Sequence, residues 1–188
     1  INDDSYAGRC LLELAEAKIA AINLHTNLDV CPGGVNDVLA ETLGLTEVSV
    51  LNPTGTDARG RPYGLIRTGM VREQRLAEFA AFVKSALPCP GLRFADAGKL
   101  VRRVAVGGGS CGGAIDDVLA AGCDTLVTAD LKYNHFEEAK YRGLNLIDAG
   151  HFETENPVCA VLERVVREAL PELTVLRAKA HKDETQFL

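Results

Sequence analysis

The stretch that decides the fold is residues 101–150, VRRVAVGGGSCGGAIDDVLAAGCDTLVTADLKYNHFEEAKYRGLNLIDAG. Three short apolar runs, VRRVAV, DTLVTAD and LNLIDAG, alternate with two segments of helical character at 114–121 and 136–141. Strands that alternate regularly with helices are typical of α/β units with a parallel sheet. We therefore predict an α/β fold in which these three runs are strands.

The rest of the chain predicts a less regular succession of elements. Apolar residues at helical spacing indicate helices, and short apolar runs bounded by turn residues indicate strands. The predicted helices are 5–20, 38–43, 73–86 and 158–170, and the predicted strands are 20–25, 46–51, 65–71, 92–96 and 173–179. Segment 52–64 is the densest cluster of Gly, Pro, Asn and Asp, so we expect a soft boundary between two lobes there.

The composition indicates a soluble globular protein. The chain has 188 residues, is 47% hydrophobic and carries a formal net charge of -6. No run approaches the roughly 20 apolar residues that a membrane helix needs, so we expect no membrane span. Acidic and basic residues are interspersed, which argues against binding to nucleic acid.

Cysteine usage and the first residues predict a cytoplasmic location. The six cysteines are scattered without a CxxC pair, which favours reduced thiols over disulfides or a zinc ribbon. The opening segment INDDSYAGRC has acidic residues where a signal peptide would have basic ones. We expect no targeting segment, and the start resembles a position within a longer protein.

The segment NLIDAGHFETEN, 145–156, places His151 and Glu155 four residues apart directly after an apolar run. In open α/β sheets, ligands gather beyond the carboxyl ends of the strands. Histidine and carboxylate side chains are good ligands for zinc, manganese or iron. The alternative is that Thr154 caps the last helix, Glu155 stabilises its positive end and His151 is a loop residue. The pair alone leaves both interpretations open.

The segment LHTNLD, 24–29, offers a second pair, His25 and Asp29, at the end of a predicted strand. The alternative is a turn in which Asp29 holds the following glycine loop. Asp130 ends the predicted strand DTLVTAD, so three predicted strand ends carry His or Asp. Three polar strand ends suggest one shared pocket, in which Asp130 would orient a ligand.

The glycine-rich segment VGGGSCGG, 106–113, lies between a predicted strand and a predicted helix. Such a loop can present N–H groups to a phosphate, but this one matches neither GxxxxGK[ST] nor a full GxGxxG pattern. Tight packing of the turn is the alternative, and Cys111 is interpreted as a plain small residue. Nearby, Lys132 is a candidate to face an anionic substrate, whereas His135 and His181 are interpreted as surface residues.

HTNLD, the glycine loop and DAGHFETE occur in the order found in the NIF-three-like dinuclear metal-centre family, which the chain resembles over most of its length. Members often carry the name type 2 GTP cyclohydrolase I homologue. The resemblance implies one unit, residues 1–188, of two α/β lobes facing a metal-binding cleft. It also implies that 154–178 packs back on the first lobe and that the complete protein is a homo-hexameric ring.

Residue by residue, the resemblance implies that Asp29, His151 and Glu155 bind two divalent ions (zinc, manganese or iron), with Glu155 as the bridge. His25 and Lys132 would be catalytic, and the glycine loop would hold a nucleotide. The glycines concerned are Gly108, Gly109 and Gly112. The family also takes ligands from an upstream His–His pair that this sequence lacks. We therefore expect a first lobe truncated at its N-terminus and an incomplete metal site.

Smaller departures from the family pattern lie in TADLKYNH. Asn134 stands where the family often has histidine, and Ala129 replaces a common glycine. Asp148 is expected to hydrogen-bond to the metal-binding side chains without binding the metal itself.

The resemblance implies a metal-dependent hydrolase in which an activated water attacks the purine imidazole ring of GTP. Phosphoester hydrolysis would use the same parts. The alternative from another class is a non-enzymatic metal-binding regulatory protein or scaffold that forms a ring.

Overall fold

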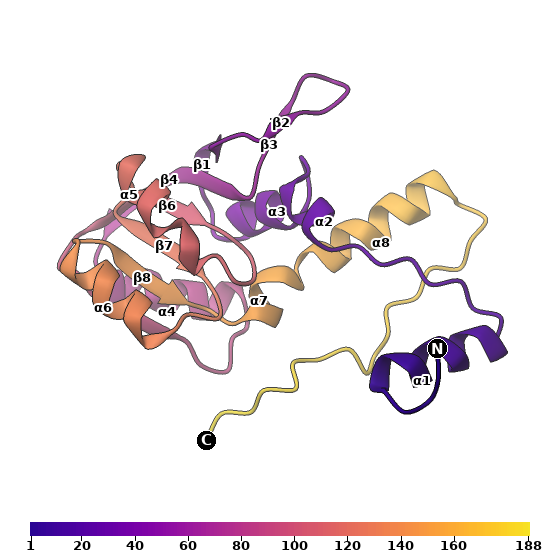
Figure 1. The fold of residues 1–188 in the computed structure, drawn as a ribbon. Coiled ribbons are helices and arrows are strands. Elements are labelled where there is room, and N and C mark those ends of the chain that lie inside the picture. The colour runs from indigo at the N-terminus through magenta and orange to yellow at the C-terminus, as the bar shows by residue number, and fades with distance from the viewer.

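The computed structural model describes residues 1–188 and is built around one six-stranded mixed sheet (Figure 1). In spatial order the strands are β1 (Thr46–Leu51), β4 (Ile66–Gln74), β6 (Val101–Val106), β7 (Thr125–Thr128), β8 (Asn145–Asp148) and β5 (Arg93–Ala95). The neighbours β6, β7 and β8 are parallel, whereas β4 is antiparallel to β1 and β6, and β5 is antiparallel to β8. The predicted α/β class and the three central strands are confirmed.

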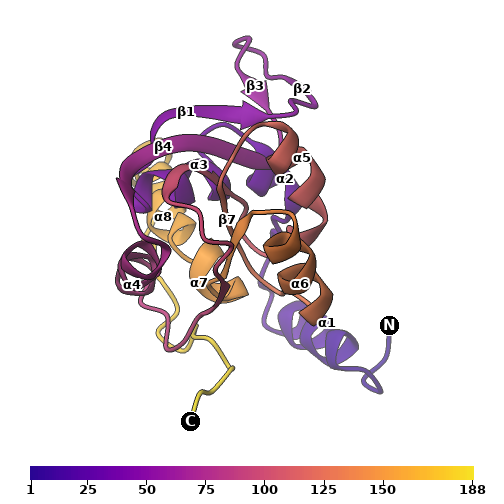
Figure 2. The same ribbon diagram turned by 90° about the vertical axis from the view of Figure 1, so that its left-hand side faces the viewer.

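Helices cover both faces of the sheet, as Figure 2 shows. One core contains residues of α3 (Val35–Thr42) and α4 (Leu76–Ala86), and the other contains residues of α5 (Ile115–Ala120) and α6 (Tyr133–Tyr141). Because side chains alternate along a strand, β6 places Val104 and Val106 in the first core and Ala105 in the second. Burial on both faces explains why the parallel strands are nearly continuous apolar runs.

Two predicted strands, 20–25 and 173–179, do not form. Both segments are extended, but neither lies beside a strand. Residues 20–24 make no backbone hydrogen bond, and the later segment is held to α8 by a hydrogen bond from Arg167 Nη2 to Val175 O at 3.0 Å and by the pair of Arg177 with Glu163 at 3.7 Å. A β-strand requires a partner for its N–H and C=O groups, which an apolar sequence cannot supply alone.

Several element bounds differ from the prediction. The first helix, α1 (Tyr6–Glu16), is capped by Ser5 and ends four residues earlier than predicted, and α3 begins at Val35 instead of residue 38. β4 continues to Gln74, which delays the start of α4 to Leu76. The last helix, α8 (Val158–Ala169), matches the prediction and, with α1, extends away from the sheet (Figure 1).

Segment 52–64 forms the short hairpin of β2 (Gly55–Thr56) and β3 (Pro62–Tyr63), which projects from the sheet (Figure 1). The hairpin leaves the sheet between β1 and β4, and these two strands pair with each other. Both sides of the expected lobe boundary therefore belong to one sheet.

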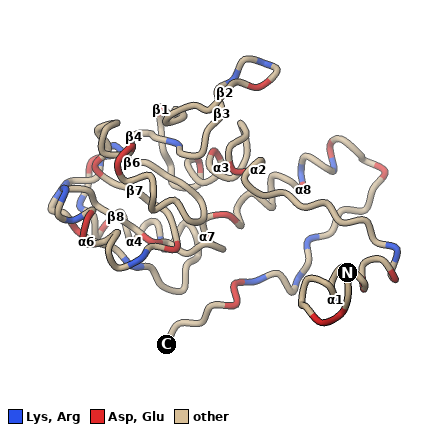
Figure 3. Tube along the Cα trace, in the orientation of Figure 1, with Lys and Arg blue, Asp and Glu red and all other residues tan.

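Charged residues of both signs are interspersed along the trace, as Figure 3 shows. All six cysteines are free thiols. None of the helices combines the length and apolar character needed to cross a membrane.

Arg67 on β4 fixes the segment that carries α2 (Thr26–Val30) against the sheet. Its side chain is only 1% exposed and pairs with Asp37 of α3. Its guanidinium also donates to Gly64 O at 2.6 Å and to Val30 O at 3.3 Å. A buried guanidinium with several acceptors is a specific anchor, because each acceptor would otherwise be buried without a donor.

We predict that Arg67→Met lowers the free energy of unfolding by at least about 2 kcal/mol, because Asp37 and the Gly64 carbonyl lose a charged donor. Arg61→Met is the matched control, since Arg61 is 52% exposed and its pair with Asp57 is worth about 0–1 kcal/mol. Urea unfolding of both variants measures the difference. Equal stability of the two would contradict the anchoring role.

Candidate functional site

The loops that follow β6, β7 and β8 meet at the carboxyl edge of the parallel strands. Backbone hydrogen bonds join them: Gly107 N donates to Val127 O at 3.0 Å and Ala129 N donates to Gly109 O at 2.9 Å. In the same way, Ala149 N donates to Thr128 O at 2.9 Å. The strand ends are therefore one connected surface.

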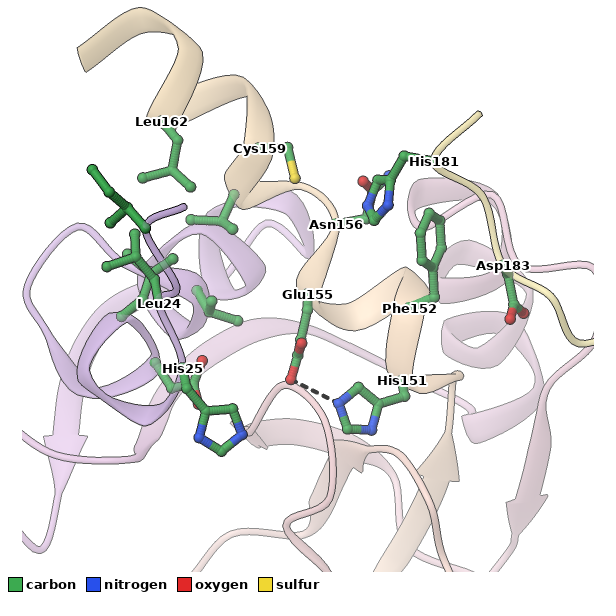
Figure 4. A pocket seen from close by; sticks show the side chains of 15 residues that line it. Leu24, His25, His151, Phe152, Glu155, Asn156, Cys159, Leu162, His181 and Asp183 are labelled. Carbon is green, nitrogen blue, oxygen red and sulfur yellow. Dashed lines mark ion pairs between the residues drawn. The ribbon is translucent and has the colours of Figure 1, made fainter. Parts of the chain in front are cut away.

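A cavity of about 560 Å³ opens beside this surface (Figure 4). It is lined by four of the residues that the sequence singled out, which come from two distant parts of the chain: His25, Asp29, His151 and Glu155. The structure thus brings the LHTNLD and DAGHFETE segments together.

His151 and Glu155 lie on one face of a short helix that the sequence did not predict, α7 (His151–Glu155). Gly150 starts the helix at φ +86°, a backbone conformation that favours glycine. A spacing of four residues brings the two side chains together, with His151 Nε2 3.0 Å from Glu155 Oε1. The dashed line in Figure 4 marks this pair.

Thr154 is not the cap of the last helix, which corrects one alternative of the sequence analysis. It lies within α7, is almost fully buried, and donates to Gly150 O at 2.9 Å. Its Oγ1 also accepts a hydrogen bond from Gly109 N at 3.0 Å. Thr154 therefore fixes the glycine loop against the helix that carries His151 and Glu155.

Asp130 orients His151 from the side opposite Glu155. Its Oδ2 lies 2.7 Å from His151 Nδ1, as expected for a residue that orients a ligand. Asp130 has φ +53°, an uncommon conformation for a residue other than glycine and one that often marks functional sites. Asp148, the other expected support, pairs with Arg93 and accepts from Leu131 N at 3.1 Å. It also accepts from Gly150 N at 3.3 Å, which holds the backbone at the start of α7.

Asn36 is the site residue that the sequence analysis missed. It is fully buried, accepts from Gly108 N at 2.6 Å and donates from Nδ2 to Asp29 O at 3.0 Å. It therefore links the helix that carries Asp29 to the glycine loop. A hydrogen bond across 72 residues leaves no local signal in the sequence.

Several N–H groups of the glycine loop donate hydrogen bonds within the protein. Besides Gly108 and Gly109, Cys111 N donates to Thr128 Oγ1 at 3.0 Å. At Gly112 an added Cβ would lie 2.7 Å from the ring of His135. These contacts favour the packing interpretation of the loop, and phosphate binding by Gly108, Gly109 and Gly112 stays a prediction.

Two further candidate residues, Lys132 and Cys111, do not line the cavity. Lys132 is exposed at the start of α6 and does not line the cavity. Cys111 is buried, and burial raises the pKa of its thiol to about 11, which disfavours the nucleophilic thiolate.

His25 lines the cavity at the start of α2, with Nδ1 3.0 Å from Thr26 Oγ1.

The carboxyl groups of the site are easier to protonate than usual. Burial raises the pKa of Asp29 and of Glu155, and their mutual repulsion adds to the rise for Glu155. Burial alone would lower the pKa of His151, but the hydrogen bond to Asp130 and the charges of Glu155 and Asp130 outweigh it and raise the pKa. Protons and cations therefore compete for one electronegative cluster.

The nitrogen and oxygen donors that line the cavity are of the types that bind a divalent ion, but their side chains do not converge on one point. A histidine nitrogen and two carboxylates suit zinc, manganese or iron. However, no three His, Cys, Asp or Glu side chains converge closely enough to hold a metal ion. His151 and Glu155 form a pair, and Asp29 lines the same cavity without completing the group.

We predict that Gly109→Ala destabilises the protein, because φ +64° costs an alanine roughly 1–2 kcal/mol and the Cβ would overlap Glu155 Oε1. It would also lie 3.0 Å from His151 Nε2. Gly113→Ala is the control, since a Cβ there meets no atom within 4 Å. Urea unfolding should place the control within about 1 kcal/mol of the original protein. Equal stability of the two variants would show that the close approach of Gly109 to Glu155 does not affect the free energy of unfolding.

Comparison with known proteins identifies similar sequences. Residues 1–184 match the profile of the family described as Duf34/NIF3 (NGG1p interacting factor 3). The GTP cyclohydrolase 1 type 2 homolog of Clostridium perfringens is 29% identical over 190 residues, which is 100% of this chain and 72% of that protein. The protein of the same name from Nostoc sp. is 39% identical over 153 residues, 79% of this chain and 56% of that protein.

Solved structures give the same result for the fold. The crystal structure of the Staphylococcus aureus hypothetical protein SA1388 has a TM-score of 0.88 at 27% identity, covering 99% of this chain and 74% of that one. The Bacillus cereus protein related to NIF3 has a TM-score of 0.85 at 24% identity, covering all of this chain and 79% of that one, and this likeness concerns the fold alone. The sequence relatives are longer, since the chain spans only 56% of the Nostoc protein.

Proposed function

Because this chain belongs to the Duf34/NIF3 family, we propose that it binds a divalent metal ion through His151, Glu155 and Asp29 and is a metal-dependent hydrolase. The single observation that carries the proposal is the 2.7 Å contact between His151 Nδ1 and Asp130. Histidines that ligate metals almost always donate their other N–H to a carboxylate, a carbonyl or a water.

This hydrogen bond selects the nitrogen that is available to an ion. With Nδ1–H donated to Asp130, the neutral imidazole has its lone pair on Nε2, the atom 3.0 Å from Glu155 Oε1. Nitrogen and carboxylate ligands must both be deprotonated to bind a metal, so binding would release the protons that this cluster retains. Asp29 is proposed as the third donor because it lines the same cavity and its carboxyl group interacts with the charge of His151, although the three side chains do not converge in the structure.

A bound ion would act as a Lewis acid and would lower the pKa of a water molecule to near neutrality. The chain itself would contribute orientation and proton transfer. Asp130 holds the imidazole of His151, and His25 is a base in the same cavity for a proton released during hydrolysis. The relatives' name makes GTP the first substrate to test, and phosphoesters follow.

A dinuclear centre would need donors in addition to these three. The family resemblance implies a His–His pair for this purpose, and this sequence has none. We therefore expect one ion per chain from the residues described here. Assembly into a ring of six remains a proposal that analytical ultracentrifugation can test.

We predict that His151→Ala, Glu155→Ala and Asp29→Ala each weaken zinc or manganese binding at least tenfold, because each removes one ligand. His181→Ala is the matched control, since His181 lines the same cavity but its ring lies against Phe152, with the two ring centroids 4.9 Å apart. Calorimetry and elemental analysis measure affinity and stoichiometry. Undiminished binding in all three variants would refute the ligand assignment.

The hydrolase part of the proposal is tested with the same proteins. Metal-loaded protein should release product from GTP or from one member of a phosphoester panel, and the three ligand variants should lose this turnover. Metal binding without turnover of any panel member would favour the alternative of a non-enzymatic metal-binding scaffold.

We predict that Asp130→Asn weakens metal binding by about 10- to 100-fold, which is typical for loss of a partner behind a ligating histidine. The amide removes the charge but keeps the size of the side chain. Asp183→Asn is the matched control at the edge of the same cavity. Nitrogen-15 NMR of the histidine rings should show a changed tautomer for His151 only in Asp130→Asn. An unchanged tautomer would refute the orienting role independently of metal binding.

A further inference from the structure

Most of the cavity wall beyond His151 and Glu155 is apolar. Figure 4 shows Leu24 and Leu162 on one side of the pair, with Phe152 and His181 on the other. The aliphatic lining comes from the extended segment before α2, from α2 and α3, and from α8: Ile22, Leu24, Leu28, Val35, Val158 and Leu162. An apolar wall beside a few polar groups is the usual composition of a site for a small organic molecule.

The charged side chains that line the cavity are all carboxylates apart from its histidines. Asp29, Glu155 and Asp183 line it, and no lysine or arginine does. Phosphate groups are normally held by arginine, lysine or free backbone N–H groups. Here the N–H groups of Gly108 and Gly109 are engaged by Asn36 and Thr154. The protein therefore offers a phosphate little attraction in this cavity.

Phe152 and His181 add a partly aromatic boundary. Their ring centroids are 4.9 Å apart with an interplanar angle of 51°, and both residues line the cavity. Aromatic faces favour planar ring systems, which bury a large apolar area without a charge. A volume of about 560 Å³ accommodates a ligand of nucleoside size.

We propose that this cavity binds the uncharged ring portion of its ligand, a planar heteroaromatic compound of nucleoside size, and that phosphate groups do not contribute to recognition. The ring lies between the aliphatic wall and the Phe152–His181 pair, with its polar edge toward His151 and Glu155. In the metal-free protein, a nucleotide keeps its phosphates outside the cavity. The proposal deepens the proposed function by naming the substrate class of the same site, and it rests on that function for the reaction but not for ring binding.

Calorimetry with guanosine and GTP tests the charge preference, since the two probes share base and ribose and differ only in the triphosphate. The full chain is first treated with a chelator, so that metal binding and ring binding are measured separately. Guanosine is expected to bind at least as tightly as GTP. Tighter binding of GTP, or no binding of guanosine at millimolar concentration, overturns the proposal whether or not the metal titration succeeds.

A pair of matched variants tests the place of binding. Leu162→Asn puts a polar group into the aliphatic wall and should weaken guanosine binding roughly tenfold. Leu170→Asn makes the same change at the end of α8, where the leucine is 44% exposed and does not line the cavity. Circular dichroism verifies that both variants fold. Equal guanosine affinity in the two variants overturns the assignment of the ring to this cavity.

Discussion

The hydrogen bonds that the glycine loop donates to Asn36 and Thr154 hold the two halves of the site together. Both acceptor side chains are buried, and leaving a buried amide unpaired would cost about 1–3 kcal/mol. Separation of the loop from these side chains is therefore unfavourable. Asn36 also binds the backbone of Asp29, and Thr154 lies between His151 and Glu155 on α7. These two buried hydrogen bonds therefore fix the positions of the candidate metal-binding side chains relative to the sheet.

The docking of the glycine loop against α7 explains why Gly109 is a glycine. A Cβ on Gly109 would overlap Glu155 Oε1 and would lie 3.0 Å from His151 Nε2, and the backbone of Gly109 is left-handed. Asp130, on the neighbouring loop, is also left-handed although it carries a side chain. Backbone strain of this kind persists only where the surrounding structure imposes it, and here it aims a carboxylate at His151.

The cavity combines two chemical characters that serve different parts of a ligand. Its His and carboxylate end attracts protons and cations, whereas its larger aliphatic and aromatic part attracts uncharged rings. Family membership does not choose between substrates, since one fold supports many reactions. The charge of the lining residues is therefore more informative about the ligand than the name of the relatives.

Local sequence determined the α/β class and the three central strands, because short apolar runs alternate there with helical segments. It placed His151 and Glu155 four residues apart, but their contact depends on α7, a helix that the sequence did not predict. Only the tertiary structure decided which apolar runs find a partner strand, since 20–25 and 173–179 remain unpaired. It alone also decided the roles of Asn36, Thr154 and Asp148. Each of them accepts a hydrogen bond from a backbone N–H that lies between 17 and 72 residues away, and a hydrogen bond across such a distance depends on how the chain folds back.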